Sequence, residues 1–270
     1  MRRLFGLLAA ATLVGPPVAG AATREVIISG STYSPRRAVA LTGDTVHWTN
    51  RDVAQHTVTS SLFDSGLLSR NEEFAYTFLS AGSVQYRCTV HFGMGGTVSV
   101  YDVYLEGPTG AVRFGRPVAL RGLAQPGSTV TIERVGDGAA IATVAAGADG
   151  RFALAFPAAG PSASYRAVEG MKTSPVVRVL VAPKVVLKAR RAGRARILTV
   201  STTPAQPGAR VALERATRAG WRRVSRKTLS ARSKATFRVR VAGPARFRAK
   251  LTRPVGGYAP ATSAGVTVRG

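Results

Sequence analysis

The stretch YRCTVHFGMGG, residues 86–96, holds the only cysteine of the chain, one of its three histidines and one of its three methionines. Cys88, His91 and Met94 therefore lie close together in the sequence. A thiolate, an imidazole and a thioether are donors that suit a soft metal, and a second imidazole would complete the donor set of a blue copper centre. A structural zinc site is a poorer match, because such sites generally need four Cys or His ligands, and this chain has one cysteine and three histidines in all.

Two histidines could supply the second imidazole. In TVHWTN, residues 45–50, the apolar Val46 and Trp48 alternate with His47, so His47 faces away from the core if those two side chains face it. His56 follows a turn-like stretch, and we expect it at the start of the next strand, where a loop can bring one ligand to another. We therefore predict that His56 is the second imidazole ligand and that His47 is a surface histidine.

The N-terminus has the pattern of a secretory signal peptide. Two arginines precede an apolar run from Leu4 to Val14, and small residues follow. The run is shorter than the roughly 20 apolar residues that a membrane helix needs. We expect a signal peptide at residues 1–21, no transmembrane segment, and a mature protein in the periplasm, the cell envelope or the extracellular space. Exported proteins use cysteines mainly in disulfides, so an unpaired Cys88 indicates a ligand or a reactive thiol; the alternative is a small buried apolar residue.

Short alternating runs bounded by Gly, Pro, Asn and Asp predict an all-β chain. In the second half, AQPGSTVTIER (residues 124–134) matches AQPGARVALER (residues 205–215). A repeat of roughly eighty residues with many short strands suits two sandwich domains better than a solenoid. With joints at Gly107-Pro108 and Ala182-Pro183, we predict a first domain at 22–104 and two sandwich repeats at 105–182 and 183–270. These repeats resemble the immunoglobulin-like modules of exported bacterial proteins.

Residues 24–101 resemble the plastocyanin-type cupredoxins in the order and spacing of their motifs. The matching segments are VIIS, YSP, GDTVHWTNRD, QHTV, FDSGLL, YTF, AGSVQYRC and GMGGTVSVY. The short Cys-x2-His-x2-Met loop has the amicyanin-like form, whereas plastocyanins have a longer gap before the methionine. The resemblance implies a Greek-key β-sandwich with one type 1 copper ion, whose ligands are the imidazoles of His56 and His91, the thiolate of Cys88 and, as a long axial ligand, Met94.

Two departures from the family pattern stand out. Thr57 occupies a position that is often asparagine in these proteins, so the hydrogen bonds that brace the cysteine loop are expected to differ. The domain is also short, which implies that a peripheral strand or loop between Thr59 and Phe74 is trimmed. We expect an aromatic core beneath the site, formed by Trp48, Phe63, Phe74, Tyr76 and Phe78. We expect a weakly polar rim around His91 for a redox partner, formed by Phe92, Gly93, Gly95 and Gly96.

Charge is unevenly distributed along the chain. Residues 22–104 carry six Lys and Arg against seven acids, whereas residues 183–270 carry 22 against one, Glu214. A surface this basic attracts polyanions. For an exported chain we expect anionic cell-envelope polymers as partners, and no nucleic acid; the alternative is a merely solvated basic surface.

These features predict a non-enzymatic, exported mononuclear type 1 copper protein that carries single electrons to and from a transient redox partner. The alternative is a copper-binding protein for storage, delivery or sequestration that has no redox partner. A third possibility is a cell-surface binding protein whose copper domain is vestigial, which the complete ligand set disfavours. Multicopper oxidases and copper nitrite reductases need more histidines than the three present.

Overall fold

The computed structural model describes residues 21–269, so the predicted signal peptide lies outside the described residues except for its last residue. The described residues form strands, turns and loops without a helix, which confirms the all-β prediction. No helix long and apolar enough to cross a membrane occurs in this range.

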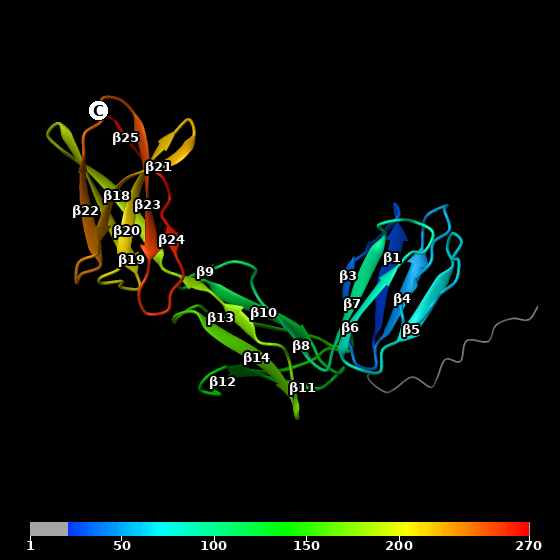
Figure 1. Ribbon diagram of the computed structural model, residues 1–270. Helices are drawn as coiled ribbons and strands as arrows, with labels where there is room; N and C mark the ends of the chain where they lie inside the picture. The colour runs from blue at the N-terminus through cyan, green and yellow to red at the C-terminus, as the bar shows by residue number, and fades with distance from the viewer. Residues whose placement is uncertain (1–20, 270) are drawn as a thin grey trace, which may run out of the picture. The chain divides into compact units, whose positions relative to one another are not determined.

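The chain divides into two compact units. The first comprises the chain up to Asp102 together with Ala124–Ser128 and Ala146–Gly150, and the second comprises the remainder. The finer division into three domains, with a joint at Ala182-Pro183, stays a prediction. Each unit is described separately below (Figure 1).

The first unit contains two sheets. Its strands are β1 (Thr23–Ser29), β2 (Thr32–Ser34), β3 (Arg37–Leu41), β4 (Thr45–Asn50), β5 (Glu73–Thr77), β6 (Gly82–Arg87) and β7 (Gly95–Tyr101). One sheet has the order β2-β1-β4-β5 and the other β3-β7-β6. Strands β1 and β4 pair in parallel, as do β3 and β7, whereas β6 and β7 are antiparallel. The two parallel pairs therefore join strands that are not consecutive in the sequence.

Apolar side chains from both sheets form one core. On β4, Val46 and Trp48 are fully buried, while His47 alternates with them and is half-buried. The ring of Trp48 lies 5.5 Å from that of Phe63 and 5.4 Å from that of Tyr86. The aromatic core predicted from the sequence is confirmed, because Trp48, Phe63 and Phe78 are buried and Phe74 and Tyr76 pack against them.

The segment between β4 and β5 contains no strand of its own. It is held instead by isolated bridges, one joining His56 to Leu68 and one joining Thr59 to Asp64. The expectation that His56 begins a strand is therefore wrong. The residues after His56 make only isolated single-residue bridges, and a strand needs consecutive paired residues.

The second unit contains two copies of one strand arrangement. The first set of strands is β8 (Tyr104–Glu106), β10 (Pro117–Leu123), β11 (Thr129–Arg134), β12 (Ala140–Ala145), β13 (Arg151–Pro157), β14 (Ala163–Glu169), β15 (Lys172–Thr173) and β16 (Val177–Val179). The second set is β18 (Lys184–Ala192), β19 (Ala195–Thr203), β20 (Arg210–Thr217), β21 (Gly220–Thr228), β22 (Lys234–Val239), β23 (Ala245–Arg253), β24 (Ala261–Thr262) and β25 (Val266–Val268). A short parallel pair, β9 (Val112–Arg113) with β17 (Val181–Ala182), completes the unit.

The two sets have the same topology. The orders β13-β10-β8 and β22-β19-β18 correspond, and so do β12-β11-β14-β15 and β21-β20-β23-β24. The last strand of each set, β16 or β25, pairs with β14 or β23. The sequence repeat superimposes β11 on β20, so the repeat seen in the sequence is also a repeat of the fold. Its assignment to the immunoglobulin-like class stays a prediction.

Candidate metal centre

Three of the predicted ligands lie on one short loop between two paired strands. Cys88 follows the end of β6, and β7 begins at Gly95, which pairs with Arg87. Within the loop, the amide of Cys88 donates to the carbonyl of Met94 (3.1 Å), and the amide of Met94 donates to the carbonyl of His91 (3.4 Å). The loop is therefore closed at its base by strand pairing and across its middle by its own backbone.

His56 reaches the same place from the segment between β4 and β5. Its side chain is fully buried. Its backbone is held on both sides, because its amide donates to the carbonyl of Leu68 (3.2 Å) and its carbonyl accepts from the amide of Leu68 (2.7 Å). The single bridge fixes the backbone from which the imidazole extends.

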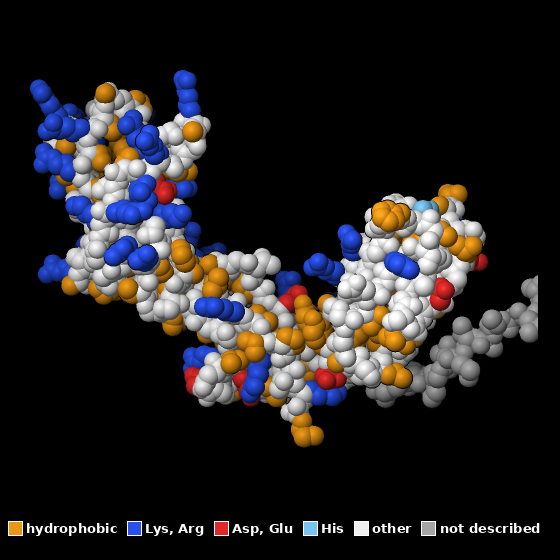
Figure 2. Space-filling model, in the orientation of Figure 1, with side chains coloured by type: hydrophobic (Ala, Val, Ile, Leu, Met, Phe, Trp, Pro, Cys, Tyr) orange, Lys and Arg blue, Asp and Glu red, His pale blue; other side chains and the backbone are white. Residues whose placement is uncertain are grey.

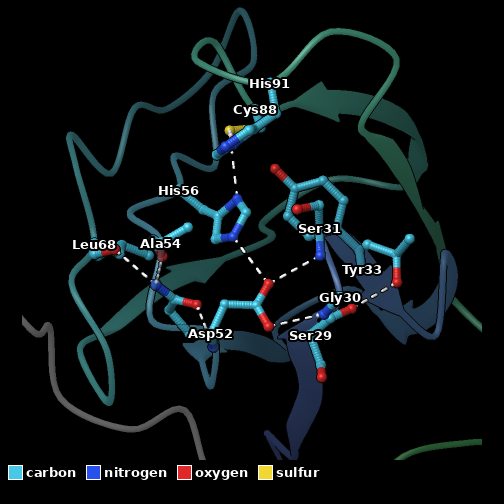
Figure 3. Close-up of polar contacts among 12 residues, drawn as sticks. Ser29, Gly30, Ser31, Tyr33, Asp52, Ala54, His56, Leu68, Cys88 and His91 are labelled. Atoms are coloured by element: carbon cyan, nitrogen blue, oxygen red, sulfur yellow. Dashed lines mark hydrogen bonds and ion pairs between the residues drawn. The ribbon is translucent and has the colours of Figure 1, made fainter.

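The side chains of His56, Cys88 and His91 converge, with their possible ligand atoms within 4.8 Å of one another. The Sγ atom of Cys88 lies 3.8 Å from Nδ1 of His56 and 3.5 Å from Nδ1 of His91 (Figure 3). Metal–imidazole and metal–thiolate bonds of about 2.0–2.3 Å would bridge gaps of this size. One thiolate and two imidazoles that present the same ring nitrogen suit a copper ion.

Met94 lies buried on the same loop, within the core of the first unit. Its assignment as the fourth, axial ligand stays a prediction from the family resemblance. His47, on the opposite side of β4 from the core residues Val46 and Trp48, does not belong to the cluster of possible ligands found among the described residues.

The Nε2 nitrogen of His56 contacts a carboxylate that was not predicted from the sequence. Nε2 of His56 lies 3.0 Å from Oδ2 of Asp52, and the same carboxylate accepts the amides of Gly30 (2.8 Å) and Ser31 (2.9 Å) (Figure 3). The amide of Ser31 is the largest cause of a lowered pKa of Asp52, and the amide of Gly30 and the imidazole of His56 lower that pKa further. A charged Asp52 accepts the Nε2 proton, which leaves Nδ1 of His56 free to bind a metal. Only a turn-like stretch surrounds Asp52 in the sequence, so no periodicity marked it.

Thr57 braces the cysteine loop in place of the asparagine common in the resembling family. Its amide points at Sγ of Cys88 (3.4 Å), and its hydroxyl accepts the amide of Thr89 (2.9 Å). Its carbonyl accepts the hydroxyl of Tyr33 (2.6 Å). Threonine at this position therefore still links the residue after His56 to the cysteine loop, and its hydroxyl group makes the link to Thr89.

The loop surface around His91 is apolar, with one correction to the predicted rim. Phe92 is fully exposed, Gly93 is exposed and His91 is half-buried. Gly96, however, is buried inside β7, where an added Cβ would lie 2.4 Å from the ring of Tyr86. It belongs to the core and not to the rim, because the Tyr86 ring packs directly on its backbone.

Comparison with known proteins gave matches among solved structures only. No family model matches the chain, and no curated protein was found to be similar to it. A purple cupredoxin from Nitrosopumilus maritimus is 30% identical, with a TM-score of 0.27, over 28% of this chain and 97% of its own. The Cu(I) form of an amicyanin variant is 30% identical, with a TM-score of 0.27, over 31% of this chain and 84% of its own. A reduced amicyanin variant is 27% identical, with a TM-score of 0.28, over the same shares.

Proposed function

We infer that the first unit of this chain is a cupredoxin domain, and we propose that it binds one type 1 copper ion and carries single electrons. The observation that supports this most directly is the convergence of one buried cysteine sulfur with Nδ1 of His56 and Nδ1 of His91. Bound copper would supply the Cu(I)/Cu(II) couple. Met94 would add the weak axial donor that is typical of blue copper sites.

The surrounding residues suit electron transfer because they restrict movement of the ligands. His56 is fixed by Leu68 on its backbone and by Asp52 on its ring, and the sulfur of Cys88 is fixed by the amide of Thr57. Ligands that keep one geometry in both oxidation states would lower the reorganisation energy of electron transfer. The half-buried His91 and the exposed Phe92 beside it in the loop supply the surface at which we expect a transient redox partner to dock.

The test is to add Cu(II) to the purified protein and record its visible absorption and electron paramagnetic resonance spectra. A thiolate–Cu(II) bond should produce the intense visible band of a type 1 site. The variant Cys88→Ser should lose that band while its far-ultraviolet circular dichroism stays that of the wild type. Colourless copper binding by the wild type, or a Cys88→Ser variant that remains blue, would reject the type 1 assignment.

A carrier and a copper store are separated by the rate of electron exchange. The braced site favours the carrier, since a store has no need of ligands held in one geometry for both oxidation states. Fast electron self-exchange between Cu(I) and Cu(II) protein, measured by line broadening in nuclear magnetic resonance, is the expected result. Slow exchange combined with ready transfer of copper to a chelator would favour storage or delivery.

We also propose that the protein is exported and that residues 183–270 attach it to anionic polymers of the cell envelope. The signal-like N-terminus supports export. The presence of 22 Lys and Arg residues against one acid in this segment supports attachment. Fractionation of cells that produce the protein should place it outside the cytoplasm, in a form released by salt.

A further inference from the structure

The excess charge of the chain is concentrated on the second repeat of the second unit. The part of the molecule that carries β18 to β25 is densely covered by Lys and Arg side chains (Figure 2). Its one acid, Glu214, is paired with Arg248 at 2.7 Å and therefore cancels only that cation. The remaining cations have no acid within residues 183–270 to neutralise them.

Strand alternation directs these cations to both outer faces of the repeat. The buried residues of the two sheets, among them Leu187, Val200, Leu213 and Ala249, form one core. Side chains at the alternate positions must therefore face outward on opposite sides. We name these surfaces the β19 face, which comprises Lys188, Arg190, Lys234 and Arg238, and the β20 face, which comprises Arg223, Arg226, Arg246 and Lys250. All eight are exposed.

The first repeat shows that the fold does not require these cations. Strand registers align Arg226, Arg223, Arg246 and Lys250 with Thr143, Ala140, Ser164 and Val168 of the first repeat. The ion pair between Arg248 and Glu214 is present there too, as Arg166 with Glu133 at 3.0 Å. The same topology thus exists with neutral side chains at these four positions, so folding does not account for the cations that occupy them on the second repeat.

We propose that the second repeat is a two-faced polycation that binds and bridges chains of an anionic glycan. This inference rests on the proposed attachment to the envelope and adds its geometry and its ligand class. The cations include 17 arginines and five lysines, and the planar guanidinium group suits bidentate contact with carboxylates. Flexible anionic chains can reach both faces of one molecule, so a single protein can link two of them.

Other polyanions match these faces less well. A planar bilayer can contact only one of two opposite faces at a time. Val224 and Val255 are the exposed large apolar residues in the described part of this repeat, so it lacks the aromatic and leucine anchors of interfacial binding. Single-stranded nucleic acid is bound by free aromatic rings, but the ring of Trp221 is stacked under Arg248 at 4.3 Å.

The experiment uses the full-length protein and polygalacturonate as the probe. Co-sedimentation measures binding, and light scattering measures bridging of the polymer. One variant carries Lys188→Gln, Arg190→Gln, Lys234→Gln and Arg238→Gln, and a second carries Arg223→Gln, Arg226→Gln, Arg246→Gln and Lys250→Gln. A control with the same change in net charge carries Arg113→Gln, Arg116→Gln, Arg121→Gln and Arg178→Gln, all exposed on the first repeat.

The wild type and the control should bind the polymer and raise light scattering, and added salt should reverse both effects. Each face variant should bind about tenfold more weakly and should not bridge. Bridging by either face variant at the wild-type level would overturn the two-face proposal, as would tighter binding to phosphatidylglycerol vesicles or to single-stranded DNA. Failure of the wild type to bind polygalacturonate, the vesicles or the DNA would reject envelope attachment as well. The copper proposal is judged separately by the visible spectrum.

Discussion

At the scale of single residues, His56 is held from two directions. Its Nδ1 faces the sulfur of Cys88, while its Nε2 contacts the carboxylate of Asp52, which two backbone amides also hold. A carboxylate in this place keeps the ring in one tautomer and would put a negative charge close to a bound metal. Hydrogen-bond partners of this kind tune a metal site without contacting the ion.

The substitution Asp52→Asn should raise the reduction potential. It keeps the size of the side chain but removes a negative charge that favours Cu(II) over Cu(I), and a rise on the order of 50 mV is expected. Protein-film voltammetry measures it. The control is Asp64→Asn in the same segment, whose carboxylate accepts from Thr59 and not from a histidine. Equal potentials in Asp52→Asn and the wild type would show that the carboxylate has no influence on the metal.

The substitution Met94→Gln tests the axial ligand, which rests on the family resemblance. An amide oxygen is a stronger donor to Cu(II) than a thioether, so copper should stay bound and the reduction potential should fall, because axial identity tunes blue copper. Spectra and voltammetry of the same sample measure both properties. If the potential does not move, Met94 is not a ligand.

At the scale of elements, the metal centre depends on how β6 and β7 pair beneath the ligand loop. Tyr86, near the end of β6, lies over Gly96 at the start of β7, and its ring also contacts those of Tyr33 and Trp48. Burial raises the pKa of Tyr86 to about 12, so its hydroxyl stays neutral throughout the physiological range. An aromatic layer therefore packs beneath the ligand loop and leaves no room for a side chain at residue 96.

The substitution Gly96→Ala should destabilise the first unit by about 1–3 kcal/mol, because the new methyl group would overlap the Tyr86 ring and force repacking. Chemical denaturation monitored by fluorescence gives the free energy of unfolding. Gly95→Ala is the matched control, since its Cβ would meet only the Tyr86 carbonyl at an ordinary 3.5 Å. A similar loss in both variants would mean that strand propensity, and not the ring contact, is responsible.

At the scale of the whole molecule, the candidate metal centre and the cationic surface belong to different units. The buried cluster of the second repeat runs from Val185 to Val268 and takes no residue from the first unit. The cluster around the metal centre lies within residues 26–100. Each can therefore be changed without removing side chains from the core of the other.

A chain that ends at Ala182 should keep the visible copper spectrum of the full protein and lose salt-sensitive binding to isolated cell envelopes, because attraction between exposed charges weakens as ionic strength rises. Absorption spectra and sedimentation with envelopes at low and high salt provide the comparison. Unchanged binding by the shortened chain would exclude residues 183–270 as the attachment surface.

The amino-acid sequence alone indicated the all-β class, the repeat, the candidate ligands His56, Cys88 and His91, which the structure brings together, and the location of the basic charge. Each of these depends on local information: period-two alternation, a rare cluster of donor side chains, or composition. The tertiary structure decided the contact between Asp52 and His56, the brace from Thr57 to Cys88, the burial of Gly96 under Tyr86, and the outward direction of the cations on two opposite faces. These features arise where non-periodic loops and paired strands bring separate side chains together, and no local pattern encodes which groups then meet.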